Sequence, residues 1–314
     1  MSRRHAIIAG TNKAGTTSLF RYLSDHPDVC PSKVKETNFF ESEIIGVEQD
    51  KIARYWKYFD SCASGSSVCL EASPKYMSLG TDVAVRIRGV ISDAKLIFIL
   101  REPVSRLLSY FFRNKQTRFH ARMAQLDLEE FVALVEDASR MSKRPEEKGP
   151  GQNAFLQFEK GCYVKYLEEF SVVFDRKAVC VVFFDELVSD PHGCVTRVAR
   201  FLDIVSVFYD DYVFQVENKT RSYRFAGIQH VGSKLNVLLE PLLNQYPGIR
   251  RVLRNMLLVK AESKPDVDDS LYDRLGHLYR PHNIALAEWV GARYPNLHLP
   301  AWLDTADHVN NEIN

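Results

Sequence analysis

A strand, a glycine-bounded loop and a helix start follow one another near the beginning of this 314-residue chain. Ala6–Ala9 is a short apolar run typical of a buried strand, Gly10–Gly15 is a tight loop, and Thr16–Leu23 begins a helix. Backbone N–H groups in such a loop bind anions together with the positive end of the helix dipole. Lys13 adds a mobile cation inside the loop. The segment therefore predicts a phosphate-binding site at the start of an α/β domain.

The spacing within this loop differs from that of nucleoside triphosphate-binding loops. Those loops have the pattern G-x-x-x-x-G-K-[ST], with Lys directly after the second glycine. Gly10 and Gly15 have the required separation, but Thr16 stands in the place of the Lys, and Lys13 lies three residues earlier. The departure disfavours a kinase or ATPase. The residues that we expect to contact a phosphate are Thr11, Asn12, Lys13, Ala14, Gly15, Thr16, Thr17 and Ser18.

Composition narrows the class of protein. With 46% hydrophobic and 26% charged residues, the chain can bury a sizeable core, and we predict one domain over residues 1–314. A net charge of +1 argues against a nucleic-acid partner, so any basic site must be local. No run approaches the roughly 18 apolar residues of a membrane span, and no signal region opens the chain. We therefore expect a soluble, cytoplasmic protein.

The cysteines suggest no metal site. The chain has six of them, without a C-x-x-C pair and without Cys/His spacing that would suit zinc. We expect all six to be free thiols in a reducing compartment. Nothing in the sequence requires a metal.

Apolar runs alternate with amphipathic segments along the chain, as in α/β proteins. Lys95–Leu100 and Ala178–Phe184 are continuously apolar, which is typical of parallel strands covered on both faces, and Val68–Glu71 is a further strand candidate. We expect a P-loop-type, three-layer α/β domain with a mostly parallel central sheet. Helical additions after about residue 115 should cover the side on which a second substrate, the acceptor, would bind. Arg140–Asn153 should be an open loop. The expected helices are Thr16–Ser24, Ile52–Tyr58, Val83–Ile91, Pro103–Lys115, Leu128–Asp137, Tyr163–Phe170, Pro191–Leu202, Val231–Asn244, Ile249–Val259 and Ser270–Val290.

A second candidate anion-binding segment follows the predicted strand Lys95–Leu100. Arg101 falls at the carboxyl end of that strand, where α/β sheets bind ligands, and Pro103 suits the first turn of the next helix. Ser109 lies about two helical turns further on. A guanidinium fork and a hydroxyl are both suited to phosphate oxygens. For Arg101 alone, a surface ion pair is the alternative, and Arg106 could equally be structural.

Two acidic segments could supply a general base. Glu36 lies in Lys33-Val-Lys-Glu-Thr-Asn-Phe-Phe, where two lysines would help to keep its carboxylate ionised. Glu71 ends a predicted strand in Leu70-Glu-Ala-Ser-Pro-Lys-Tyr. A solvated charge run is the alternative for Glu36. Glu71 could be a second acid, an orienter of Lys13 or a satisfied structural carboxylate.

These motifs together resemble those of sulfotransferases that use 3′-phosphoadenosine 5′-phosphosulfate (PAPS), and among them the carbohydrate enzymes, including the heparan sulfate enzymes. The Lys13 loop is similar to the 5′-phosphosulfate loop of that family. The Arg101 to Ser109 segment is similar to its 3′-phosphate-binding segment. The family's K-E-x-x-F-F element matches at Glu36, which the resemblance implies takes the proton of the acceptor, with Glu71 and His120 as rivals for that role.

Further matches extend along the chain, with one departure. Asn218 to Arg224 resembles a late basic loop that closes over the 3′-phosphate, with Arg221 as its favoured contact, and a solvated basic loop is the alternative. Leu70 to Tyr76 resembles the family pattern E-K-[ST]-P-x-Y, but Ala72 stands where related enzymes have Lys. Lys75 is the nearest replacement.

The resemblance implies in-line transfer of a sulfonate group from PAPS to an acceptor hydroxyl or amine, most simply that of a saccharide or glycoconjugate. Lys13 would stabilise the leaving phosphate. A secondary metabolite or an acyl-chain hydroxyl is the alternative acceptor. A P-loop kinase or NTPase and a non-catalytic nucleotide-binding module are the alternatives of a different class.

Overall fold

The computed structural model describes residues 4–41, 49–62, 65–117, 120–215, 221–223, 258–260 and 267–303. The chain forms two compact units. The first comprises Met1–Arg106, Glu159–Glu217 and His277–Asn314, and the second comprises Leu107–Phe158 and Asn218–Gly276. The single domain expected over 1–314 stays a prediction.

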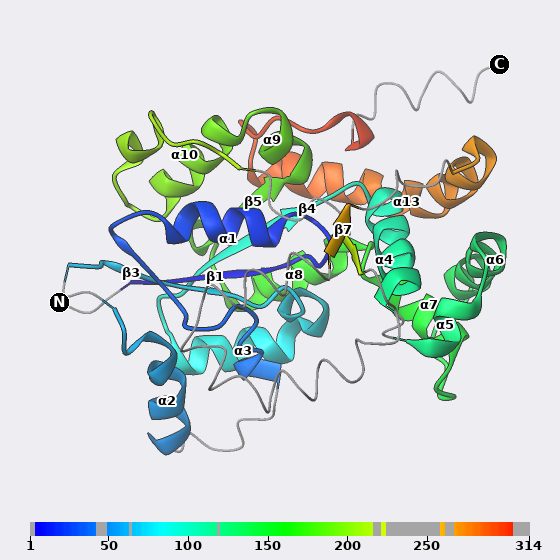
Figure 1. Ribbon diagram of the computed structural model, residues 1–314, viewed down its shortest axis with the longest axis horizontal. Helices are drawn as coiled ribbons and strands as arrows, with labels where there is room; N and C mark the ends of the chain where they lie inside the picture. Colours follow the sequence, from blue (N-terminus) through cyan, green and yellow to red (C-terminus); the bar gives the residue numbers. More distant parts are fainter. Residues whose placement is uncertain are drawn as a thin grey trace. The chain divides into compact units, whose positions relative to one another are not determined.

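Five parallel strands form the central sheet of the first unit, in the order β2-β3-β1-β4-β5 (Figure 1). They are β1 (Arg4–Gly10), β2 (Val29–Pro31), β3 (Val68–Ala72), β4 (Lys95–Leu100) and β5 (Val179–Phe183). The predicted parallel sheet is confirmed, and β4 has the expected bounds. β2 was not predicted, because three residues are too few to show a period and its last residue is a proline.

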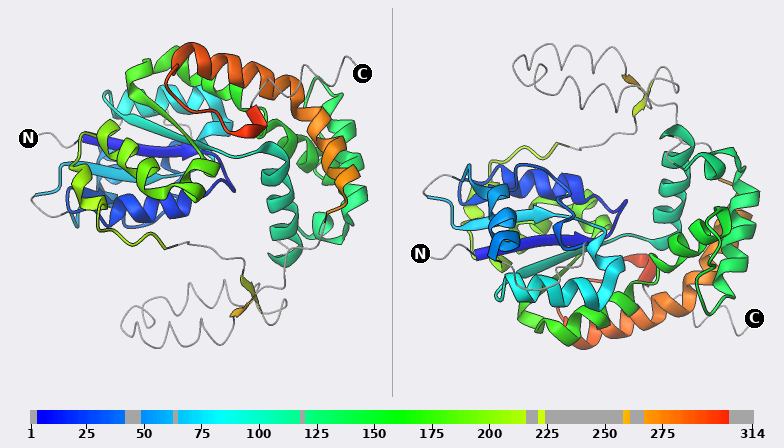
Figure 2. Two further views of the ribbon diagram at one scale, coloured as in Figure 1. Left: turned by 90° about the horizontal axis from the view of Figure 1, so that it is seen from above. Right: turned by 90° about the horizontal axis from the view of Figure 1, so that it is seen from below.

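Alternate side chains of the strands enter two apolar cores, one on each face of the sheet. On one face lie α1 (Thr16–Ser24) and α10 (Pro191–Phe201), and on the other lie α3 (Gly80–Val90) and α8 (Tyr163–Val173) (Figure 1). Figure 2 shows the same layers from above and from below. The three-layer α/β architecture expected from the sequence is thereby confirmed.

The remaining elements divide between the two units. Those of the first unit are η1 (Phe39–Glu41), α2 (Gln49–Trp56), η2 (Lys57–Phe59), η3 (Tyr76–Leu79), η4 (Arg176–Ala178), α9 (Phe184–Ser189), η5 (Ser206–Tyr209) and η6 (Ala301–Leu303). Those of the second unit are α5 (Ala121–Gln125), α6 (Leu128–Ser139), most of α7 (Pro150–Glu159), and the antiparallel strands β6 (Arg221–Tyr223) and β7 (Leu258–Lys260). Two helices, α4 (Pro103–Thr117) and α13 (Asp269–Arg293), belong to both units. In the part of the chain that the structure describes, no helix is both long enough and apolar enough to cross a membrane.

Some expectations about individual segments are wrong. Arg140–Asn153 is not wholly a loop, because α7 begins at Pro150, a residue suited to the first turn of a helix. The end of the expected helix Ile249–Val259 belongs instead to strand β7. The rest of that helix, and the whole of the expected helix Val231–Asn244, lie outside the described residues.

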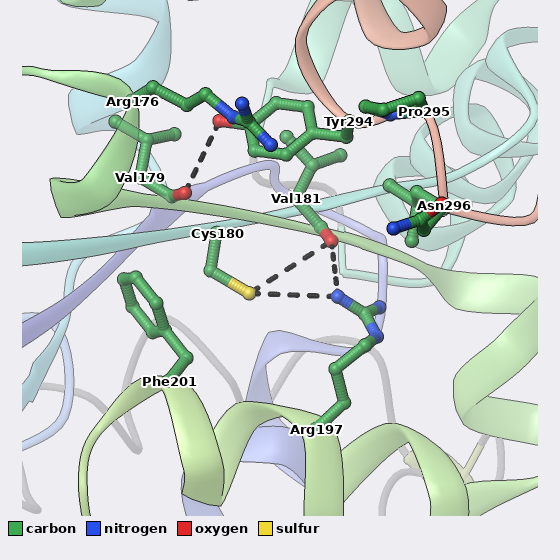
Figure 3. A pocket seen from close by; sticks show the side chains of 10 residues that line it. Arg176, Val179, Cys180, Val181, Arg197, Phe201, Tyr294, Pro295 and Asn296 are labelled. Carbon is green, nitrogen blue, oxygen red and sulfur yellow. Dashed lines mark hydrogen bonds between the residues drawn. The ribbon is translucent and has the colours of Figure 1, made fainter.

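Side chains cover the outer edge of β5 (Figure 3). The Tyr294 hydroxyl donates a hydrogen bond to the Val179 carbonyl (3.2 Å), and the Arg197 guanidinium donates one to the Val181 carbonyl (3.0 Å). Arg197 also forms an ion pair with Glu186 on α9. A pocket of about 270 Å³ lies along this edge. Because an open edge is a template for another strand, these donors close the sheet on this side.

Cys30 and Cys62 form a disulfide, which corrects the expectation of six free thiols. Cys30 lies on β2, and Cys62 follows η2. No local spacing marks this pair, because the two cysteines meet only when α2 and η2 return the chain to the sheet. The other four cysteines are buried free thiols. The argument from thiols to a reducing compartment therefore fails, and a cytoplasmic location stays a prediction.

We expect Cys62→Ser to lower the free energy of unfolding by about 3–4 kcal/mol, because the disulfide closes a long loop and restricts the unfolded chain. The two cysteines are 32 residues apart. Denaturant unfolding of the oxidised protein measures the loss. A reducing agent should destabilise the wild-type protein by a similar amount and leave Cys62→Ser unchanged. Equal sensitivity of both proteins to reduction would contradict the expectation.

Candidate active site

The carboxyl ends of β1, β3 and β4 lie side by side, because these strands are parallel neighbours. After β1 the chain continues through α1 to the β2 side of the sheet, and after β4 it continues toward β5 on the other side. The strand order thus reverses between β1 and β4. Open α/β sheets bind ligands outside the carboxyl ends of strands at such a reversal. The loops that leave β1 and β4 there carry Lys13 and Arg101.

The loop after β1 is anchored at both ends. The Thr11 N–H donates to the Ile99 carbonyl on β4 (2.8 Å). Gly15 is the N-cap residue of α1 in a left-handed conformation (φ 86°), and its carbonyl accepts the Ser18 N–H (3.0 Å). Lys13 is also left-handed (φ 70°). Thr11, Ala14 and Thr16 are buried, and Asn12, Lys13, Gly15, Thr17 and Ser18 are half-buried. The predicted strand, loop and helix are confirmed, and the contacts of these residues with a phosphate stay predictions.

Arg101 lies against this loop. Its Nη1 donates to the Lys13 carbonyl (3.1 Å), and its guanidinium lies over the Phe184 ring, 4.6 Å from the ring centroid. The Tyr163 hydroxyl donates to the Arg101 carbonyl (2.7 Å), and burial raises the pKa of that hydroxyl, which keeps it a donor. Two of the contacts that hold its guanidinium are thus a backbone carbonyl and an aromatic ring. A phosphate at the start of α1 would therefore have a second cationic group nearby.

Phe184 contacts both the Gly15 end of the loop and Arg101, a role that its sequence context did not predict. The residue starts α9 directly after β5. A Cβ atom built on Gly15 would lie 2.9 Å from the Phe184 ring, so this glycine is required by close approach as well as by its φ. Phe184 ends the apolar run Ala178–Phe184. Within such a run, the sequence does not distinguish an aromatic residue of the core from one that contacts the functional site.

The other predicted phosphate contacts have different surroundings. Arg106 is fully buried, which favours its structural interpretation. Ser109 is half-buried on α4 in the second unit. Arg221 lies on β6 opposite Lys260 on β7. Binding of a 3′-phosphate by Ser109 and Arg221 stays a prediction.

Glu36 lies in the turn between β2 and η1, in a left-handed conformation (φ 65°). Its N–H donates to the Ala72 carbonyl at the end of β3 (2.8 Å). Its half-exposed carboxylate accepts a hydrogen bond from Lys35 (2.7 Å). Lys33 instead pairs with Asp60 (3.6 Å), so only one of the two lysines expected at Glu36 contacts it.

Glu71 is fully buried at the end of β3, and its described partners are hydroxyl groups. Its interpretation as a satisfied carboxylate is confirmed, and the orientation of Lys13 by Glu71 is not observed. Lys75, the proposed replacement for the family lysine, pairs with Glu41 (3.4 Å). His120 is an exposed N-cap residue of α5 in the second unit, and its rival role as base stays a prediction.

The model of the sulfotransferase domain family matches residues 3–224 of this chain. The chain belongs to this family. The matched range contains the whole sheet and the segments of Lys13, Glu36 and Arg101. The resemblance seen in these motifs is thereby confirmed.

Named sulfotransferases are similar to the chain over most of its length. Human heparan sulfate glucosamine 3-O-sulfotransferase 3B1 is 25% identical over 286 residues, which cover 91% of this chain and 63% of the human protein. The bifunctional heparan sulfate N-deacetylase/N-sulfotransferase 1 of Caenorhabditis elegans is 21% identical over 303 residues, which cover 96% of this chain and 31% of that protein. The chain thus spans less than two thirds of the length of these relatives.

A solved structure supports the fold. The crystal structure of a sulfotransferase from Alicyclobacillus acidocaldarius superposes with a TM-score of 0.62 and 22% identity. The superposition covers 97% of this chain and 100% of the bacterial one. At this level of identity the likeness establishes a shared fold.

We expect Gly15→Ala to lower the free energy of unfolding by about 1–2 kcal/mol from the left-handed backbone alone. The contact of the new methyl group with Phe184 should add to the loss. Chemical denaturation measures it. Gly89→Ala is the control, because Gly89 is an exposed residue within α3 with open space around a Cβ, and this change should stabilise by about 0.5–1 kcal/mol. Equal effects of the two substitutions would show that neither φ nor Phe184 constrains Gly15.

Proposed function

We propose that this sulfotransferase moves a sulfonate group from PAPS to a hydroxyl or amine of a saccharide. The observation that carries the proposal is the contact between Arg101 and the Lys13 loop. That contact places a guanidinium beside a phosphate-type loop in which Thr16, and not Lys, follows Gly15. PAPS has a 5′-phosphosulfate and a separate 3′-phosphate, whereas ATP has phosphates on the 5′ position only. Two neighbouring anion-binding elements suit the first nucleotide.

The residues at the carboxyl edge of the sheet fit such a donor. The loop amides and Lys13 would hold the 5′-phosphate at the start of α1, and Arg101 would hold the 3′-phosphate. Bound PAPS supplies an activated sulfonate, and the acceptor must lose a proton as its oxygen or nitrogen attacks sulfur. Glu36 is proposed to take that proton, because its carboxylate is half-exposed and lies on the turn fastened to the end of β3. Lys13 would stabilise the charge on the leaving phosphate.

The names of the relatives support a saccharide acceptor. The human relative is named as a glucosamine 3-O-sulfotransferase, and the nematode relative as an N-sulfotransferase, both for heparan sulfate. The two names differ in the acceptor atom, so the proposal extends to a hydroxyl or an amine of a sugar. A turnover screen with labelled PAPS and saccharide acceptors of both kinds tests this part.

The donor proposal predicts a preference between two nucleotides. The protein should bind adenosine 3′,5′-bisphosphate far more tightly than adenosine 5′-monophosphate without Mg²⁺. Arg101→Ala should weaken bisphosphate binding about 10–100-fold, because a hydrogen bond to a charged group contributes about 1.5–3 kcal/mol. Isothermal titration calorimetry measures both affinities.

The matched control is Arg176→Ala. Arg176 also lies over an aromatic ring, that of Tyr294, but at the amino end of β5. This variant should leave both affinities unchanged. Equal affinity of the wild-type protein for the two nucleotides would overturn the donor assignment.

The proposed base predicts the result of an isosteric change. Glu36→Gln removes proton acceptance and keeps the size of the side chain, so turnover should fall by about 10²–10⁴-fold while the affinity for adenosine 3′,5′-bisphosphate is kept. Steady-state kinetics and calorimetry measure the two quantities. Glu168→Gln, at an exposed position of α8, is the control and should change neither. Wild-type turnover in Glu36→Gln would exclude Glu36 as the base.

A further inference from the structure

Four hydroxyl hydrogens converge on the buried carboxylate of Glu71. Thr37, Ser73 and Tyr76 donate to its Oε1, and Tyr55 donates to its Oε2, at distances between 2.5 and 2.8 Å. Among the described residues, no Lys or Arg pairs with Glu71. A buried carboxylate is tolerated only when its oxygens are well hydrogen-bonded, and these four donors fulfil that need.

Three of the four hydroxyls also accept a backbone N–H of the turn that follows Glu36. Ser73 Oγ accepts the N–H of Asn38 (3.1 Å), and Thr37 Oγ1 accepts that of Phe39 (3.3 Å). The Tyr76 hydroxyl accepts the N–H of Phe40 (3.2 Å). A hydroxyl has a single hydrogen, and here each hydrogen is directed to Glu71, so the lone pairs face the amides. One carboxylate thereby orients the acceptors of three consecutive amides.

The turn held in this way has an unusual backbone. Glu36 and Asn38 are both left-handed, with φ of 65° and 50°. Glutamate rarely adopts such a conformation unless its surroundings determine it, whereas asparagine adopts it more readily. The Glu36 N–H is bound directly to the Ala72 carbonyl, and the amides of residues 38–40 are bound through the three hydroxyls. The end of β3 therefore determines the backbone on which the Glu36 carboxylate stands.

The fourth hydroxyl, that of Tyr55, has a different second partner. The Tyr55 hydroxyl lies 2.8 Å from His5 Nε2. Burial lowers the pKa of His5 to about 3, so the ring is neutral at pH 7 and Nε2 can donate to the tyrosine oxygen. Burial, and then the charge of Glu71, raises the pKa of both Tyr55 and Tyr76, so each keeps its hydrogen. Tyr55 and Tyr76 are thus alike in burial and in donation to Glu71, and only Tyr76 accepts an amide of the turn.

We propose that Glu71 is a positioning residue for the reaction: through the hydroxyls of Thr37, Ser73 and Tyr76, it holds the turn that presents the Glu36 carboxylate. The proposal rests on the proposed function of Glu36 as the base. Glu71 itself is not in reach of an acceptor, because it is fully buried. Small displacements of a reacting group can lower a rate about 100-fold, so fastening the turn has a catalytic consequence.

Tyr76→Phe and Tyr55→Phe form a matched pair that tests the proposal. Each removes one hydroxyl donor from Glu71 at a fully buried position. Tyr76→Phe should lower kcat about tenfold and leave the KM for PAPS and the affinity for adenosine 3′,5′-bisphosphate unchanged. Tyr55→Phe should keep kcat within about twofold of wild type, although unfolding of both variants should become easier to a similar degree. If Tyr76→Phe does not fold, Ser73→Ala takes its place in this test. It removes another hydroxyl that binds the turn, and it should lower kcat to a similar degree.

Hydrogen exchange supplies a readout that does not depend on activity. The amides of residues 38–40 should exchange faster in Tyr76→Phe and Ser73→Ala than in wild type, and at the wild-type rate in Tyr55→Phe. Equal kcat losses in the two tyrosine variants, or unchanged exchange in all of them, would overturn the positioning role. Faster amide exchange in Tyr76→Phe or Ser73→Ala together with wild-type turnover would also overturn it. The proposed role of Glu36 as the base is tested separately, because wild-type turnover in Glu36→Gln would refute it.

Discussion

The parallel pairing of β1 with β3 on one side and β4 on the other decides where this chain can place its chemistry. Parallel neighbours all end at the same edge of a sheet, so the segments that leave them are brought together whatever their separation in the sequence. Lys13 follows the end of β1, Ala72 ends β3 and binds the Glu36 amide, and Arg101 follows the end of β4. Because both faces of the sheet are covered by helices, this edge is where polar groups of the strands' ends can meet a ligand.

The parts of the site that the sequence predicted are those determined by local signals. An apolar run, a glycine and a helix start suffice for the Lys13 loop, because the glycine's φ and the helix dipole act within a few residues. The strand before Arg101 could also be predicted from the sequence, because an uninterrupted apolar run is typical of a strand buried on both faces.

The parts that were missed depend on contacts between distant segments. Asn38 is of a residue type that favours a left-handed backbone, but no local signal marks Glu36, whose turn is bonded to Ala72, Ser73 and Tyr76. Phe184 lies in a run whose other members are core residues, and only the fold brings its ring to Gly15 and Arg101. The disulfide partners were likewise unreadable, because α2 and η2 lie between them.

The segment Leu70 to Tyr76 illustrates how one motif can serve architecture and catalysis together. From the sequence alone, its glutamate could be an acid near the reaction, an orienter of Lys13 or a structural carboxylate. In the structure its polar members turn inward, where Glu71, Ser73 and Tyr76 form one hydrogen-bonded group with the neighbouring turn. A substitution there would look like a catalytic defect in kinetics, although none of these side chains need touch the acceptor.

The Cys30–Cys62 bridge makes the Glu36 turn part of a covalent ring that starts and ends on well-packed structure. This ring is not a free loop, because part of β2 and the core residues Phe40, Tyr55 and Phe59 lie within it. The bridge therefore closes packed elements around the turn. The turn is held covalently through the two ends of the ring, and by hydrogen bonds from the segment that follows β3 at its middle.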